Sequence, residues 1–449
     1  MYSFLLGLES LRQHARRNVL AGAAIAVGLL AMMSIIGYVN RTNSYLAAIA
    51  IYIQQPGHVA IIKKDSLRRR MIEPKLYSLS APEWTALDAY LSQDTKVAFI
   101  SPYLFGFGLV GDGCKSFPFT VTGFDLKKQA AVIAHPELKA IIPEYKSLTG
   151  GENLWDSHEK APIALSGGLA KKMNKSANTD GLAYPGTFES TECDKPAVKA
   201  KLAFDRNIQL LTQDFDNRLN AVDGDFVGEF STGVDFTEKS SMQMPIHLLQ
   251  ELLRTDKISY IGVFLKNRLE AHDYAQSIVK IMADKGIQID AYPWDAEAWN
   301  QNYFASAGVM VVTELFVGLI VALVVLLSIV NTLTIGLAEA RREIGMLRAV
   351  GYNPNQIASI FAVESFATAV LAVGIGSLLA FILFEFIAQL KIAMHFPGFS
   401  QESTFQIDPP SWTYAFVSVL LVLLVVGTSA VLARRYASQP ILNLLDRGG

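Results

Sequence analysis

The sequence predicts an α-helical membrane protein with four transmembrane helices and one large α+β extracytoplasmic domain. Hydrophobic residues make up 51% of the 449 residues, and only 18% are charged. Mean hydropathy is +0.29. The apolar residues gather near the N-terminus and in the last third, and the stretch between them has the texture of a soluble domain. The formal net charge of -2 gives no indication of nucleic-acid binding.

Four segments are long enough to cross a bilayer, which takes about 20 apolar residues. They are expected at residues 19–39, 309–338, 357–384 and 412–433. Residues 1–18 are expected to form a cytoplasmic amphipathic helix. A cleaved signal peptide is the alternative for the first segment, and it is disfavoured because the apolar run exceeds the usual signal-peptide length.

Loop charge predicts the orientation, because short cytoplasmic loops are enriched in arginine and lysine. Three arginine clusters flank the segments: Arg12, Arg16 and Arg17; Arg341, Arg342 and Arg348; Arg434, Arg435 and Arg447. All three agree with one topology, in which both termini and residues 339–356 are cytoplasmic. The tail, 434–449, is then inside, whereas residues 40–308 and the loop 385–411 are outside.

Patterns within residues 40–308 predict mixed strands and helices. Residues 57–62, 117–124 and 258–266 look like strands, and Ser80 to Glu83 has capping-box spacing before an apolar run. A strand–helix–strand unit is expected just before the second membrane segment. The aromatic run 103–107 is read as buried strand in preference to a substrate contact. Residues 174–201 are polar and weakly periodic, which is typical of a loop or inserted subdomain.

The two cysteines of the chain, Cys114 and Cys193, both fall in the exported region. An oxidising compartment permits a disulfide between them. Two free thiols are the alternative, since sequence does not give the separation of the two Cα atoms.

Enzyme motifs are missing from the sequence. There is no Gly-Lys dipeptide and hence no P-loop for ATP, and Ser166 lacks the Gly-x-Ser-x-Gly context. His158-Glu159 has no second histidine at zincin spacing, and the seven histidines are scattered. We therefore expect no catalytic residue, no metal site and no cofactor in this chain.

One acid, Glu364, lies inside the third membrane segment. A charged group at mid-bilayer is costly, so it rarely faces lipid. An ion or substrate contact is one interpretation. The preferred one is a bond to a neighbouring helix, with Asn331 as the expected partner.

The most informative stretch is residues 339–351, directly after the second membrane segment. It is helical in propensity, mixed in charge, and ends at Gly351. A short helix of this kind can insert apolar side chains into a partner while its arginines meet carboxylates. The expected contacts are Arg341, Arg342, Glu343, Met346, Leu347 and Arg348. The alternative is a helix that lies on the lipid surface.

This stretch, Glu-x-Arg-Arg-Glu-Ile-Gly-x-Leu-Arg-Ala-x-Gly, resembles the signature of the MacB/FtsX-like ABC transporter permeases. The resemblance implies a coupling helix that docks on a separate cytoplasmic ATPase dimer, which would bind the ATP and Mg. It also implies a MacB-like periplasmic core domain, a second permease (the same chain or a sister chain), and the bacterial inner membrane.

The exported region is similar to lipoprotein-releasing permeases of the LolC/LolE type in residues 57–61, in residues 162–170 and at Trp294. That likeness implies extraction or export of a lipoprotein, lipid or other amphiphile, with a periplasmic acceptor protein as a further partner. The polar stretch 174–201 departs from that group. The alternative function is an FtsX-type signal transmitter that activates a cell-wall hydrolase without transport.

Overall fold

The computed structural model describes residues 15–143, 145–177, 195, 205–395, 400 and 402–440. The chain divides into two compact units. The helical unit comprises Met1–Asn43, Gly308–Ile392 and Thr404–Gly449, and the α+β unit comprises Ser44–Ala307 and Ala393–Ser403. The fold class predicted from the sequence, four long apolar helices and an α+β domain, is confirmed.

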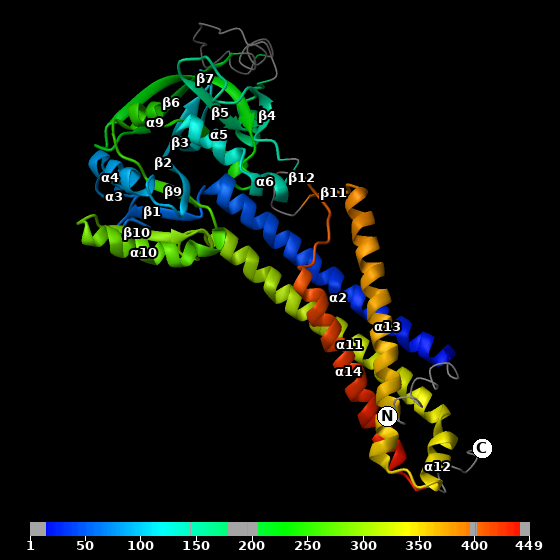
Figure 1. Cartoon of the computed structure of the whole chain (residues 1–449). Helices are drawn as coiled ribbons and strands as arrows, with labels where there is room; N and C mark the ends of the chain where they lie inside the picture. Colours follow the sequence, from blue (N-terminus) through cyan, green and yellow to red (C-terminus); the bar gives the residue numbers. More distant parts are fainter. Residues whose placement is uncertain are drawn as a thin grey trace. The chain divides into compact units, whose positions relative to one another are not determined.

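Among the residues that the structure describes, four helices are long and apolar enough to cross a membrane (Figure 1). They are α2 (Ala15–Ile49), α11 (Gln301–Glu339), α13 (Pro354–Gln389) and α14 (Ser411–Ala437). All four extend beyond the segments expected from hydropathy, because a helix continues into polar sequence wherever its backbone bonds are satisfied. Asn353 and Gln356 form a capping box at the start of α13, with Pro354 in its first turn.

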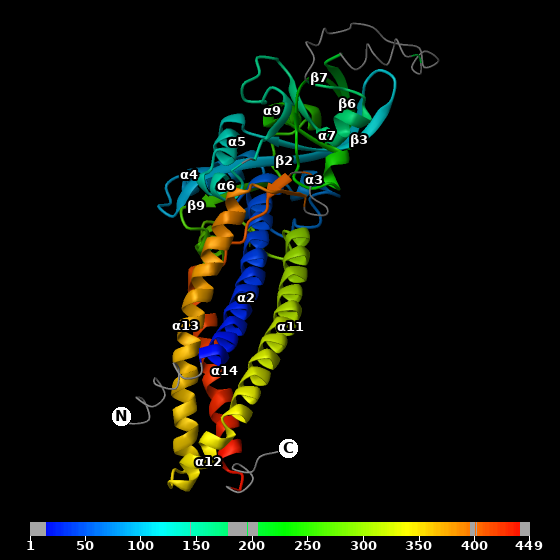
Figure 2. The ribbon, with the colours of Figure 1, turned by 90° about the vertical axis from the view of Figure 1, so that its right-hand side faces the viewer.

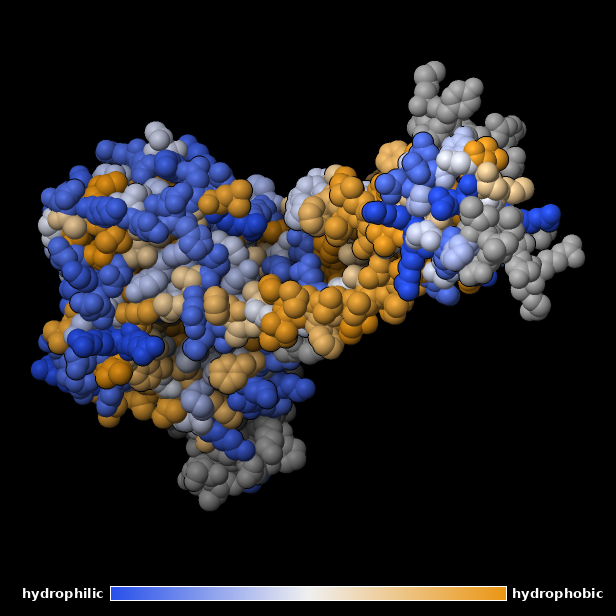
Figure 3. Space-filling model, turned by 90° about the horizontal axis from the view of Figure 1, so that it is seen from below, coloured by the Kyte–Doolittle hydropathy of each residue, from blue (hydrophilic) through white to orange (hydrophobic). Residues whose placement is uncertain are grey.

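The helical unit has one main apolar core. Leu29 and Met33 of α2, Val325 of α11, Ala369 of α13 and Leu421 of α14 are all buried there. The α13 and α14 helices run side by side (Figure 2). The outer surface of the helices is largely hydrophobic (Figure 3). A soluble helix would bury this face, so its exposure fits a lipid environment.

The α+β unit is built on a 10-stranded sheet of order β10-β1-β9-β2-β3-β8-β5-β7-β4, with β6 paired to β2 and β7. The strands are β1 (Val59–Lys63), β2 (Val97–Gly111), β3 (Ser116–Phe124), β4 (Leu148–Gly151), β5 (Pro162–Ser166), β6 (Asn207–Gln213), β7 (Leu219–Phe230), β8 (Ser241–Pro245), β9 (Tyr260–Leu265) and β10 (Ile289–Pro293). A separate two-stranded sheet pairs β11 (Ala393–His395) with β12 (Glu402–Thr404).

Helices of the α+β unit are mostly short. They are α3 (Pro74–Tyr77), α4 (Ala81–Leu91), α5 (Leu126–Ile133), α6 (Pro136–Ile141), α7 (Gly167–Lys172), α9 (Ile246–Leu253) and α10 (Ala271–Asp284). The expected capping box of α4 is present: Glu83 Oε2 accepts from the Ser80 backbone N at 2.8 Å and from Ser80 Oγ at 2.7 Å. This satisfies polar groups that the start of a helix otherwise leaves open.

The expected strand–helix–strand unit is β9, α10 and β10, and β1 lies between its two strands. Val59 of β1 pairs with Pro293 of β10 on one side and with Val263 of β9 on the other, both antiparallel. Ile278 and Met282 of α10 are buried against this part of the sheet. The local sequence around β9 and β10 could not predict that β1 lies between them, because β1 is about 200 residues away in the chain.

A second core fills the other half of the sheet, beneath α7 and α9. Leu249 and Leu252 of α9 are fully buried there with Val121 and Leu210. The aromatic run 103–107 lies in β2, as expected. Its first residues are buried, but the Phe107 side chain is 53% exposed, so the buried-strand interpretation holds only for the first part of the run.

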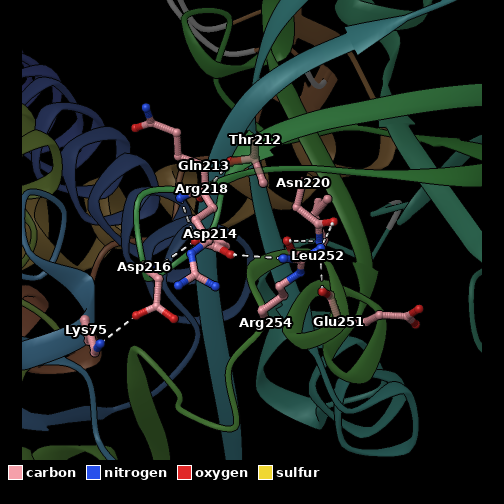
Figure 4. A network of polar contacts seen from close by, with 10 residues as sticks. All are labelled: Lys75, Thr212, Gln213, Asp214, Asp216, Arg218, Asn220, Glu251, Leu252 and Arg254. Atoms are coloured by element: carbon pink, nitrogen blue, oxygen red, sulfur yellow. Dashed lines mark hydrogen bonds and ion pairs between the residues drawn. The ribbon is translucent and has the colours of Figure 1, made fainter.

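Hydrogen bonds fix the turn between β6 and β7 (Figure 4). Asp214 Oδ1 accepts from the backbone N of Asp216 at 2.9 Å and of Arg218 at 2.8 Å. Asn220 Nδ2 donates to the Leu252 carbonyl at 2.8 Å, which ties the hairpin to the end of α9. Asp216 also accepts from Lys75 Nζ at 2.5 Å. The hairpin therefore holds both α9 and the segment before α4 in place.

A π-helix, η1 (Ala50–Gln54), continues the chain after α2, and Tyr52 on it is the centre of a buried network. The Tyr52 hydroxyl donates to Glu137 Oε2 of α6 at 2.7 Å and lies 3.3 Å from His58 Nε2. The Tyr52 ring stacks on His135 with centroids 4.9 Å apart. Arg268 Nη1 pairs with Glu137 Oε1 at 2.5 Å. This network joins η1 to α6 and to the start of β1.

Candidate functional site

The segment after α11 forms a separate short helix, α12 (Arg341–Ala349). Ala340 interrupts the run between α11 and α12 with φ -79° and ψ 5°. Gly351 follows α12 with φ +105°, a conformation that strongly favours glycine. The chain then turns at Asn353 into α13. The break, the glycine and the capping box together set α12 apart as its own element.

Apolar contacts attach α12 to the helical unit from one side. The Ile344 side chain is fully buried with Ile357 and Phe361 of α13 and with Ala433 of α14. Leu347 is half-buried and packs against the same cluster. At about 100° per residue, Ile344 and Leu347 fall on one face of the helix. This face is internal, so it is unavailable to a partner.

The opposite face of α12 is open. Arg341 and Arg342 are exposed, Met346 is 52% exposed, and Val350 just beyond the helix is 79% exposed. Glu343 and Arg348 are intermediate, and Arg348 Nη1 donates to the Tyr352 carbonyl at 3.4 Å. The two exposed apolar side chains lie four residues apart, on the same face as Arg342.

Two details differ from the sequence interpretation of this segment. Leu347 was among the expected contacts, but its half-buried side chain packs inward against the helical unit. Val350 was not among the expected residues, although its spacing of four from Met346 was a signal that could have found it. The charge pattern alone did not show which stripe of the helix was already occupied.

The intramembrane acid Glu364 is buried in the helical unit. Its Oε1 accepts a hydrogen bond from Asn18 Nδ2 of α2 at 3.1 Å. The expected partner was Asn331, but that residue is exposed on α11. Asn18 was missed because it lies at the edge of the first apolar segment, 346 positions away in the chain.

Hydroxyl groups extend this polar cluster toward α14. Ser365 Oγ donates to Ser429 Oγ at 2.7 Å, and Ser429 Oγ donates to the Phe361 carbonyl at 3.3 Å. A cavity of about 30 Å³ adjoins Glu364, Ser365, Ser429 and Thr332, enough for one water molecule. Polar contacts of this kind hold helices together where lipid offers no alternative partner.

Small residues allow the helices to approach closely. Ala372, Gly376 and Ala380 are all buried on α13. A Cβ added to Gly376 would lie 3.0 Å from the Cα of Ala26 on α2, too close without a shift of the backbone. This stripe of small residues therefore forms a helix–helix contact.

The other expected sites have simple outcomes. Cys114 is disulfide-bonded. Cys193 lies outside the described residues, as does most of the polar stretch 174–201, so the Cys114–Cys193 pairing stays a prediction. Within the part of the chain that the structure describes, no group of three His, Cys, Asp or Glu is placed to hold a metal ion.

Residues 315–441 match the family model described as FtsX-like permease C-terminal. A curated protein, ABC transporter permease YtrF of Bacillus subtilis (strain 168), is 24% identical over 195 residues, which cover 42% of this chain and 42% of the relative. The chain therefore matches less than half the length of that relative.

Two solved structures are similar to part of the chain. The periplasmic region of MacB from Actinobacillus actinomycetemcomitans matches with a TM-score of 0.32 and 12% identity, over 54% of this chain and 91% of that one. The extracellular domain of the noncanonic ABC-type transporter YknZ from Gram-positive bacteria matches with a TM-score of 0.31 and 11% identity, over 52% and 98%.

The matched family region begins within α11 and ends just after α14, so it contains α12 and Glu364 but not the Asn18 partner of that acid. The four apolar helices and the sheet domain describe a multi-pass membrane protein with an extracytoplasmic domain. Over residues 315–441, this chain is therefore similar to the C-terminal region of FtsX-like permeases.

Proposed function

We propose that this chain is the permease subunit of an ABC transporter and that α12 couples it to a separate cytoplasmic ATPase. The observation that carries the proposal is the division of α12 into two faces. Ile344 fixes it to α13 and α14, while Met346 and Val350 project outward beside Arg342. A helix held rigidly on one side and open on the other can transmit a push from a partner.

The chemistry of the open face suits a protein partner. Interfaces depend on a few apolar anchors, while charges set orientation and encounter rate. Met346 and Val350 would supply the anchors, and Arg341 and Arg342 would meet carboxylates of the ATPase. The chain has no P-loop, so ATP and Mg would be bound by that partner.

The proposed output is mechanical. Motion of α12 would pass along the membrane helices to the exported domain, and a second permease, either the same chain or a sister chain, would complete the transporter. We propose an amphiphile, such as a lipoprotein or lipid, as the substrate, in line with the LolC/LolE resemblance. Few charged residues lie within the apolar helices, which suits extraction from a leaflet better than a polar channel.

The test compares substitutions on the two faces of α12. Met346→Asp places a charge on the open face and is expected to lower the co-purifying ATPase activity at least tenfold. Met346→Leu is expected to leave that activity unchanged. Asn355→Asp is the matched control, because it adds the same charge at an exposed position in the first turn of α13. All three variants should insert and fold, since none of these side chains is buried.

Two results would count against the proposal. If wild-type protein brings down no ATP-hydrolysing partner, the permease assignment fails. If Met346→Asp and wild type bring down equal ATPase activity, α12 lies on lipid and is not the coupling element. ATP-dependent release of an amphiphile from reconstituted vesicles would separate transport from the alternative, an FtsX-type signal transmitter that only activates a hydrolase.

A further inference from the structure

A basic loop, residues 64–76, lies between β1 and the end of α3 in the α+β unit. It contains five cationic side chains (Lys64, Arg68, Arg69, Arg70 and Lys75) and two carboxylates, Asp65 and Glu73. The whole chain has a net charge of -2, so this positive charge is a local feature. The proposed coupling mechanism does not use it.

In the basic loop a cationic side chain is buried and apolar side chains are exposed, which is the reverse of the usual distribution. The Arg70 guanidinium lies inside, 4.6 Å from the ring centroid of Trp299 and 5.7 Å from that of Phe105. Its apolar neighbours point outward, with Met71 46% and Ile72 79% exposed. Arginine is rarely buried and isoleucine is among the residues most often buried, so this arrangement sacrifices stability locally.

Several bonds hold the basic loop in one conformation. The backbone N of Asp65 donates to Asp290 Oδ2 at 2.8 Å, and the Arg70 backbone N donates to the Ser66 carbonyl at 2.9 Å. At the other end, Lys75 pairs with Asp216 of the β6–β7 turn. The exposure of Met71 and Ile72 therefore belongs to an ordered loop. Inversions of this kind in an ordered segment are expected at functional surfaces.

The exposed groups of the basic loop combine two chemistries. Arg68 and Arg69 are exposed cations, and Arg69 Nη1 donates to the Tyr77 hydroxyl at 2.7 Å. Three apolar side chains stand beside them: Met71, Ile72 and Leu76, the last 62% exposed. Cations next to exposed apolar side chains are the composition of segments that rest on anionic lipid surfaces.

We propose that the basic loop binds an anionic lipid surface, with Arg68 and Arg69 at the headgroups and Ile72 inserted among the upper acyl chains. A protein partner would require about 800 Å² of matched surface on each side. A single loop offers much less, whereas a lipid surface needs no matched shape. The domain is joined to membrane helices at both ends, so lipid is always at high local concentration.

The experiment uses the full chain in nanodiscs of phosphatidylcholine, with or without one-third phosphatidylglycerol. An environment-sensitive fluorophore is attached at Ile72→Cys under non-reducing conditions, and the unsubstituted protein gives the background. Leu219→Cys is the matched control, because Leu219 is 70% exposed on β7 of the same domain. Nitroxide-labelled lipids then report whether the fluorophore enters the bilayer.

The expected result is blue-shifted emission and quenching by lipid nitroxides at position 72 only, strongest with phosphatidylglycerol and reduced at 500 mM NaCl. Each basic residue near an anionic surface contributes about fivefold to binding, so Arg68→Gln with Arg69→Gln should lower the bound-to-free ratio about twenty-fivefold.

Three results would overturn the proposal. No quenching in either lipid shows that the basic loop stays in water. Equal quenching in both lipids, unaffected by the arginine substitutions, shows that anionic headgroups are not recognised. A spectral change that requires an added acidic protein, without lipid quenching, assigns the loop to a protein partner. None of these measurements includes an ATPase, so they are independent of the proposed coupling function.

Discussion

We call the contact between η1 and the sheet the joint. Acidification is expected to weaken this contact, because His58 is buried in it. The side chain is buried, its Nδ1 accepts from the Leu265 backbone N at 3.0 Å, and its Nε2 faces the Tyr52 hydroxyl. Burial lowers the pKa of His58 to about 4, and this outweighs the Glu137 carboxylate at 3.9 Å. A second proton on Nδ1 would also cost the bond from Leu265. Three other groups face this site: Glu137, His135 and Arg268.

The size of the effect follows from the two pKa values of His58. When the joint opens, the ordinary value of 6.5 returns, so the open state binds more protons than the closed state between pH 6.5 and about 4. The free energy of opening the joint is therefore at its maximum above pH 6.5 and decreases as the pH falls. The loss is about 2 kcal/mol at pH 5 and about 3 kcal/mol at pH 4. Burial also lowers the pKa of His135, which adds a change of the same sign.

Hydrogen exchange of the full chain in detergent measures this joint directly. After correction for the intrinsic pH dependence of exchange, amides of β1 and β9 should lose protection by about twentyfold between pH 7 and pH 5. His58→Asn keeps an acceptor for Leu265 but cannot titrate, so its profile should be nearly flat. His272→Asn is the matched control, because that histidine side chain is 62% exposed. If wild type and His58→Asn show the same pH profile, burial of His58 does not govern the joint.

Three further predictions concern topology, packing and the cysteines. Thiol labelling of intact cells should reach a cysteine at Asn217 from outside and one at Asn353 only after permeabilisation, and labelling of both from one side would refute the four-helix topology. Gly376→Leu should lower the stability of the helical unit by about 1–3 kcal/mol, because its Cβ meets the backbone of α2, and an unchanged melting temperature in detergent would contradict this contact. If Cys114 bonds Cys193, thiol capping without reductant should modify neither residue, and full capping of both would exclude the pair.

Hydrophobic length and turn chemistry gave the four apolar helices and much of the local structure of the domain. The strand at 117–124 and the capping box at Ser80 both appear where the local pattern placed them. These features depend on residues within about one or two turns of each other, so a single stretch of sequence contains the information. The segment after the second membrane helix was likewise recognisable from its own residues.

Contacts between distant residues had to come from the tertiary structure. Only the folded helical unit shows that Asn18, not Asn331, meets Glu364, and that Leu347 faces inward while Val350 faces out. The position of β1 between β9 and β10 is of the same kind. The sequence determines which side chains lie on each face of a helix, but several other residues of the chain have suitable chemistry to contact that face. The choice among them is made by the simultaneous packing of all the helices and strands, in which each contact depends on the others.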